Sequence, residues 1–188
     1  GPPMMKVIAT NSTMNGRSEM ADIVADATIT NDGTVDDLRR IVVSIDPAVT
    51  SKGDSDETGI IVAGVDHDGR AHVLADLSGK MAPDRWAQRS VDAWDTWHAD
   101  RIVAEVNNGG DLVERNLRTV RPGIPFKAVT ASRGKLTRAE PVASLYALGK
   151  VSHAEPFPEL ESQMVGYDGT GDSPDRMDAL VWALTELM

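Results

Sequence analysis

The first half of the chain contains apolar runs with the length and composition of β-strands. Residues 41–45 form a run rich in β-branched side chains that stops at Asp46 and Pro47, and residues 59–65 form a second apolar run. Short runs of this kind that end at proline or turn residues are typical of buried strands. His67, Asp68 and Gly69 then predict a hairpin turn into a third strand over residues 71–77.

From Pro83 the apolar positions change to helical spacing, which predicts a helix that runs to about Ala99 and places its tryptophans in the core. Beyond it, strand and helix patterns alternate. Strands are expected over residues 101–106 and 124–129, and a short strand or turn is expected at Val151. Helices are expected to begin at Asp111 and at Pro174 and to cover residues 138–148 and about 159–165. Three locally joined strands followed by this alternation predict an α/β fold, a mixed five-stranded sheet flanked by helices.

We expect an N-terminal segment over residues 1–38 and one domain over residues 39–188. Gly1, Pro2 and Pro3 are typical of an expression scar. Residues 6–38 carry scattered Asp, Thr, Asn and Gly with only short apolar runs. This pattern indicates a linker or a loosely ordered arm.

Composition narrows the function classes. Hydrophobic residues make up 41% and charged residues 26% of the 188 positions, as in an ordinary globular domain. With 0 Cys, the chain has no disulfide framework, no Cys-ligated metal centre and no thiol chemistry. No stretch approaches the ~20 apolar residues of a membrane span, so we expect a cytoplasmic protein without membrane contact.

Charge is distributed unevenly along the chain. The formal net charge of the whole chain is -10. Residues 113–150 contain 8 Lys or Arg against 2 Glu, a net charge of +6. The remaining residues contain 11 Lys or Arg against 27 Asp or Glu, a net charge of -16. A basic segment within an acidic chain indicates either a contact with an anion such as a nucleic-acid backbone or a solvated basic face.

Two carboxylates stand at the ends of predicted strands. Asp46 follows the first strand, where open α/β sheets place their ligands, although Asp-Pro also initiates turns for purely structural reasons. Glu105 interrupts an apolar strand, and a buried carboxylate is costly unless it is paired or bound to a cation. Arg101 or Arg133 would serve as an ion-pair partner, so a structural and a functional role for Glu105 both stay open.

Two further carboxylates lie on the C-terminal helix. Ser173 is the expected N-cap and Pro174 the expected first helical residue. Asp175 in the first turn is explained by the helix dipole. Asp178 has no such explanation, and it lies three residues later on the same face, beside the apolar stripe. We therefore expect this helix to hold both acids close to the sheet.

Four carboxylates with no Cys and few His describe an oxygen-ligand site for Mg²⁺ or Mn²⁺. Such a site can hold two cations that activate a water and stabilise the leaving oxygen of a phosphodiester. The basic segment would then hold a nucleic-acid backbone nearby through phosphate contacts. A P-loop motif and a nucleophile-elbow serine are both missing from the sequence, and the four histidines are interpreted as turn or surface residues rather than ligands.

From about Arg40 to the C-terminus, five motifs taken in order resemble the nuclease domain of the large terminase subunit of tailed bacteriophages. The motifs are IDPA (45–48), TGIIVAG (58–64), AEVNNGG (104–110), ASRGK (131–135) with RAEP (138–141), and SPDRMDALVWAL (173–184). Each motif is short, and the resemblance depends on their order and spacing.

The resemblance implies a ribonuclease H-like fold and a Mg²⁺- or Mn²⁺-dependent endonuclease that cuts concatemeric double-stranded DNA when packaging starts and ends. In terminases one acid of the Asp175/Asp178 pair dominates, and we expect Asp178 to be that acid because its position has no capping explanation; the site is expected to hold two ions. The implied metal ligands are Asp46, Glu105, Asp175 and Asp178, and the expected DNA contacts are Arg133, Lys135 and Arg138.

The resemblance also implies partners and a place of action. The partners are an N-terminal ATPase half, whose Walker motif is missing here, the small terminase subunit and the portal protein, and the place is the cytoplasm of the infected bacterial host. Two alternatives stay open. One is a non-catalytic DNA-binding or portal-docking module on the same fold, and the other is a nuclease like the Holliday-junction resolvases, whose C-terminal acid pair is similar.

Overall fold

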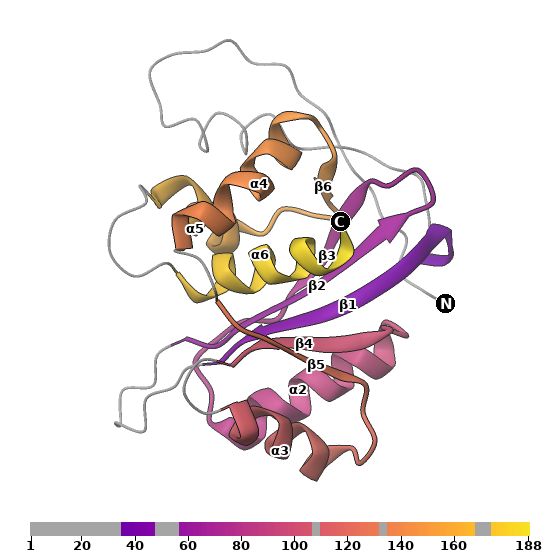
Figure 1. Cartoon of the computed structure of the whole chain (residues 1–188), viewed down its shortest axis with the longest axis vertical. Coiled ribbons are helices and arrows are strands. Elements are labelled where there is room, and N and C mark those ends of the chain that lie inside the picture. The colour runs from indigo at the N-terminus through magenta and orange to yellow at the C-terminus, as the bar shows by residue number, and fades with distance from the viewer. Residues whose placement is uncertain (1–34, 48–56, 107–109, 132–134, 168–173) are drawn as a thin grey trace.

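The computed structural model describes residues 35–47, 57–106, 110–131, 135–167 and 174–188 (Figure 1). After a 3-10 turn, η1 (Val35–Asp37), the chain forms β1 (Leu38–Asp46), β2 (Gly59–Asp66), β3 (Ala71–Asp76), β4 (Arg101–Glu105), β5 (Phe126–Val129) and β6 (Val151–His153). The helices are α2 (Pro83–Thr96), α3 (Gly110–Val120), α4 (Lys135–Ala147), α5 (Pro158–Gly166) and α6 (Asp175–Leu187).

The strands form one mixed sheet in the order β5-β4-β1-β2-β3-β6. β1, β2 and β3 are an antiparallel meander, β4 and β5 continue it in parallel with β1, and β6 lies parallel to β3 at the other edge. The mixed α/β fold is thus confirmed, but the sheet has six strands rather than the five expected. β6 has only three residues, two of them polar, so it gives no apolar run that distinguishes a strand from a turn.

Helices cover both faces of the sheet (Figure 1). α2 and α3 pack on one face, and α4, α5 and α6 pack on the other. Side chains alternate along each strand, so Val42 belongs to the α6 side while Val43 belongs to the α2 side. The expected place of the tryptophans is confirmed fully for Trp86, which is buried, and in part for Trp94 and Trp97, which are half-buried against the same core.

The interpretation of the histidines is wrong for two of the four. His67 and His98 are exposed, but His72 and His153 are buried in the sheet. His72 lies between Ser152 Oγ at 2.7 Å and Asp66 Oδ2 at 2.9 Å. His153 has comparable partners on either side of its ring. These polar rings are buried because each ring nitrogen finds a partner, which satisfies its hydrogen-bonding capacity away from water.

The segment expected to be an arm lies mostly outside the described residues, since only positions from Val35 onward are described. Those positions form η1 and the start of β1. Among the described helices, none has both the length and the apolar character that a membrane crossing needs.

Candidate active site

Asp46 and Glu105 lie side by side at the carboxyl ends of neighbouring parallel strands. The register pairs Ile45 of β1 with Ala104 of β4, and Asp46 and Glu105 each occupy the next position along. Ile45 and Ala104 belong to the core on the α2 side. Because side chains alternate along a strand, Asp46 and Glu105 point to the α6 side. Two carboxylates distant in sequence are therefore placed on one face at one end of the sheet.

The first turn of α6 packs directly onto this end of the sheet. Gly59 of β2 is the register partner of Asp46. A Cβ atom at Gly59 would lie 2.0 Å from the carbonyl oxygen of Asp175 and 3.0 Å from Cβ of Ala179. This close approach requires glycine at position 59. It brings the turn that carries Asp175 and Asp178 next to Asp46, and Asp178 is itself 5% exposed.

Glu105 is 7% exposed and is held by two donors. Trp182 Nε1 on α6 donates to its Oε2 at 2.6 Å, and Arg138 Nη1 on α4 donates to the same oxygen at 3.2 Å. The Arg138 guanidinium also lies 4.8 Å from the centre of the Trp182 ring. Trp182 is one helical turn after Asp178, so the face of α6 that carries Asp178 is the one that meets Glu105.

Of the two ion-pair partners expected for Glu105, the prediction of Arg101 is wrong. Arg101 starts β4 and Glu105 ends it, so the two side chains lie at opposite ends of the strand, and Arg101 instead approaches Glu186 at 3.6 Å. Arg133 lies outside the described residues. Arg138 takes this role, and it comes from a helix that begins 30 residues beyond the strand, a contact that strand pattern alone does not reveal.

The α6 start also differs from the expectation. Pro174 is the N-cap residue, in an extended conformation, and Asp175 is the first helical residue. Ser173, the expected N-cap, lies outside the described residues. Asp175 is in the first turn, as expected, and Asp178 is in the first turn as well, so the helix dipole favours both acids.

Chemically, the four acids fit a hard divalent cation, because all of their ligand atoms are carboxylate oxygens. The elements that carry the four acids, β1, β4 and α6, meet at one end of the sheet. Within the described ranges, however, no three His, Asp or Glu side chains are grouped so that they could hold a metal. The four-ligand metal centre therefore stays a prediction.

Of the residues expected to contact DNA, only Arg138 has a described side chain. Lys135 is the first residue of α4, one turn before Arg138, and Arg133 lies outside the described residues. The Arg138 side chain is 11% exposed. Its Nε is buried and has no hydrogen-bond partner among the described residues. The Arg138 guanidinium thus pairs with Glu105 through Nη1, while its Nε donor has no partner among the described residues.

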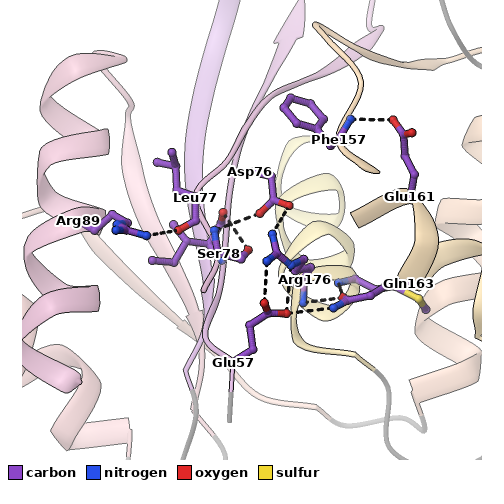
Figure 2. A network of polar contacts seen from close by, with 11 residues as sticks. Glu57, Asp76, Leu77, Ser78, Arg89, Phe157, Glu161, Gln163 and Arg176 are labelled. Atoms are coloured by element: carbon purple, nitrogen blue, oxygen red, sulfur yellow. Dashed lines mark hydrogen bonds and ion pairs between the residues drawn. The ribbon is translucent and has the colours of Figure 1, made fainter. Parts of the chain in front are cut away.

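The sequence reasoning missed Arg176, which lies between Asp175 and Asp178. Its guanidinium pairs with Glu57 and Asp76 at 2.6 Å each (Figure 2). One signal for it was present: a basic residue in the first turn of a helix opposes the helix dipole and needs a specific partner.

Solved structures share this architecture. The large terminase nuclease from thermophilic phage G20c with bound zinc has a TM-score of 0.59 at 17% identity, over 78% of this chain and 81% of that chain. A mutant nuclease domain of the large terminase subunit of bacterial virus Sf6, with manganese and beta-thujaplicinol, has a TM-score of 0.57 at 13% identity, over 79% of this chain and 89% of that chain. The large terminase of bacteriophage HK97 has a TM-score of 0.58 at 12% identity, over 79% of this chain but 39% of that chain.

These likenesses show a shared α/β fold, and the family model that the chain matches gives that fold as ribonuclease H-like, as expected. No curated protein matches the chain. Residues 43–187 match the family model of the terminase RNaseH-like domain, and the chain belongs to that family. The resemblance found in the sequence is thereby confirmed.

Proposed function

We propose that this domain is a metal-dependent endonuclease of a viral DNA-packaging terminase, which cuts concatemeric double-stranded DNA at the start and end of packaging. The observation that carries the proposal is the register of β1 and β4, which places Asp46 beside Glu105 under the first turn of α6. Family membership supports the same activity. Two of the four acids, Glu105 and Asp178, are buried, and burying carboxylates is costly, which favours a catalytic role over a binding module.

In this proposal Asp46, Glu105 and Asp178, joined by Asp175, hold one or two Mg²⁺ or Mn²⁺ ions. Such ions, when bound, activate a water and stabilise the leaving oxygen of the phosphodiester. The chain itself supplies a rigid frame: two acids are fixed at strand ends and two on a packed helix. The Trp182 indole orients Glu105 through its hydrogen bond, as partners of metal-binding carboxylates commonly do.

The DNA backbone would lie beside α4. The Arg138 side chain is 11% exposed, and a guanidinium at the surface is a suitable donor to a phosphate oxygen. Arg133 and Lys135 would add charge in the same segment. Phosphate contacts of this kind hold a duplex without reading its sequence. We further propose the ATPase half, the small terminase subunit and the portal protein as partners, and the cytoplasm of the infected host as the place of action.

Cleavage of supercoiled plasmid tests the proposal. The wild-type domain should nick and linearise the plasmid with Mn²⁺ or Mg²⁺ and not with EDTA. Asp46→Asn and Asp178→Asn should lose this activity while they remain folded, whereas Glu186→Gln, at the other end of α6, should keep it. Metal-dependent cleavage that survives both aspartate substitutions would contradict the proposed site. Equal rates on linear duplex and on a four-way junction would argue against a resolvase.

A further inference from the structure

Arg176 is the centre of a polar network beside the proposed ligands (Figure 2). Its Nη2 donates to Oε1 of Glu57 at 2.6 Å, and its Nε donates to Oε2 of Glu57 at 3.0 Å. Its Nη1 donates to Oδ2 of Asp76 at 2.6 Å. The two bonds to Glu57 have the two-pronged form in which guanidinium and carboxylate fit best. One side chain thus joins α6 to the end of β3 and to the residues just before β2.

Gln163 on α5 completes the network. Its Oε1 accepts the backbone N–H groups of Arg176 at 3.1 Å and Met177 at 3.3 Å, while its Nε2 donates to Oε2 of Glu57 at 3.0 Å. The first N–H groups of a helix need acceptors from outside the helix, and the N-cap Pro174 makes no side-chain capping bond. Gln163 therefore performs the capping that the local sequence does not provide.

This network lies where α6 meets the sheet. Arg176 follows Asp175 directly and precedes Asp178 by two residues, all within the first turn of α6. Glu57 precedes Gly59 by two residues, and Gly59 is both the register partner of Asp46 and the contact of the Asp175 carbonyl. Because a helical turn moves as a unit, anchoring Arg176 fixes the distance of Asp175 and Asp178 from Asp46.

Two acids depend on this one guanidinium. The Asp76 side chain is 4% exposed and that of Arg176 is 13% exposed. Burial by itself lowers the pKa of Arg176, but its hydrogen bonds to Glu57 and Asp76 outweigh that effect and raise the pKa. Without the guanidinium, the carboxylates of Glu57 and Asp76 would lose the cation that neutralises them, and the first turn of α6 would lose its ion pairs to the sheet.

We propose that Arg176 is a positioning residue, which holds Asp175 and Asp178 in register with Asp46 so that the site binds a divalent cation. The inference rests on the proposed function. Arg176 contacts neither DNA nor cation in this role, and it acts through the backbone of α6.

Mn²⁺ binding measured by isothermal titration calorimetry, well below the melting temperature, tests the proposal. Arg176→Gln should weaken Mn²⁺ affinity roughly 10- to 100-fold, the usual effect of removing a group that orients a metal ligand. Arg176→Lys keeps the charge without the two-pronged geometry and should lose less. Glu186→Gln removes an ion-pair partner of Arg40 and Lys127 near the C-terminal end of α6, so it should lower the melting temperature and leave Mn²⁺ affinity unchanged.

Hydrogen exchange supplies a readout that needs no metal. In Arg176→Gln the amides of Met177 and Asp178 should exchange faster, while those near Leu184 keep their protection. If Arg176→Gln does not fold, Glu57→Gln decides the matter, because it removes charge from the same pairing and should weaken Mn²⁺ binding in the same direction. If the folded variant bound Mn²⁺ with the affinity of the wild type, this inference would be overturned and the proposed function would still stand. A wild-type domain that binds no Mn²⁺ would overturn the proposed function and this inference with it.

Discussion

Trp182 donates its indole N–H to Glu105 across 2.6 Å, from a helix to the end of a strand 77 residues earlier. Since Trp182 lies one turn after Asp178, this bond fixes the angle at which α6 presents Asp178 to the sheet. The bond is buried and its acceptor is a carboxylate, two conditions under which a hydrogen bond contributes most.

Trp182→Phe should therefore lower the free energy of unfolding by about 1.5–3 kcal/mol, the range for hydrogen bonds to charged groups. Urea denaturation of the single variants and of the pair with Glu105→Ala, which removes the acceptor, separates this bond from the lost ring volume. A double-mutant cycle in which the two effects simply add would show that the indole and the carboxylate do not interact.

Gly59→Ala should displace the first turn of α6, because the new Cβ would lie 2.0 Å from the backbone oxygen of Asp175. Overpacking of this kind costs about 1–3 kcal/mol. We expect that loss in urea denaturation and a strong loss of plasmid cleavage. Gly166→Ala is the matched control, since its Cβ would meet nothing within 4 Å. Unchanged cleavage by Gly59→Ala would mean that the contact with α6 does not position the acids.

Arg138→Gln should weaken the binding of duplex DNA and reduce the slope of log affinity against log salt by about one, as expected for the loss of one phosphate contact. Fluorescence anisotropy in EDTA measures this without cleavage. Arg118→Gln removes the same charge from an exposed pair with Glu114 on α3, on the other face of the sheet, and should have little effect. An equal loss in both variants would indicate a diffuse charge effect rather than a contact.

The pH dependence of stability should include a contribution from Glu161. Its hydrogen bond with His153 lowers its pKa below the ordinary 4.5, and the Phe157 N–H adds to this effect while burial opposes it. A carboxylate with a lowered pKa in the folded state stabilises the fold above its unfolded-state pKa, and the gain is lost as the pH falls through the folded-state value.

Urea denaturation of wild type and Glu161→Gln between about pH 7 and pH 3 measures this contribution. The difference in unfolding free energy between the two should be largest at neutral pH and shrink below the ordinary pKa of 4.5. Glu159→Gln on the exposed side of the same helix is the control. A difference that stays constant over this range would contradict the assigned pairing.

The positions of Asp46 and Glu105 at strand ends could be predicted from the sequence, but the groups that contact Glu105 could not. Asp46 and Glu105 were predictable because each follows or interrupts an apolar strand, a local pattern that also sets the side of the sheet it faces. The side chains that pair with the Glu105 carboxylate and the Arg176 guanidinium come from residues 33 to 119 positions away, so no periodicity reveals them. His72 and His153 were misassigned because their burial depends on polar partners that other elements supply, Ser152 of β6 for His72 and Glu161 of α5 for His153.

We propose that Asp46, Glu105 and Asp178 together hold a divalent cation. Anomalous diffraction from crystals of the domain grown or soaked with Mn²⁺ locates such a cation, with Asp178→Asn crystals treated in the same way. We expect strong anomalous peaks between the three carboxylates in the wild-type protein and weakened or missing peaks in the variant. Mn²⁺ bound elsewhere, or no peak between these acids in a protein that cleaves plasmid with Mn²⁺, would contradict the claim.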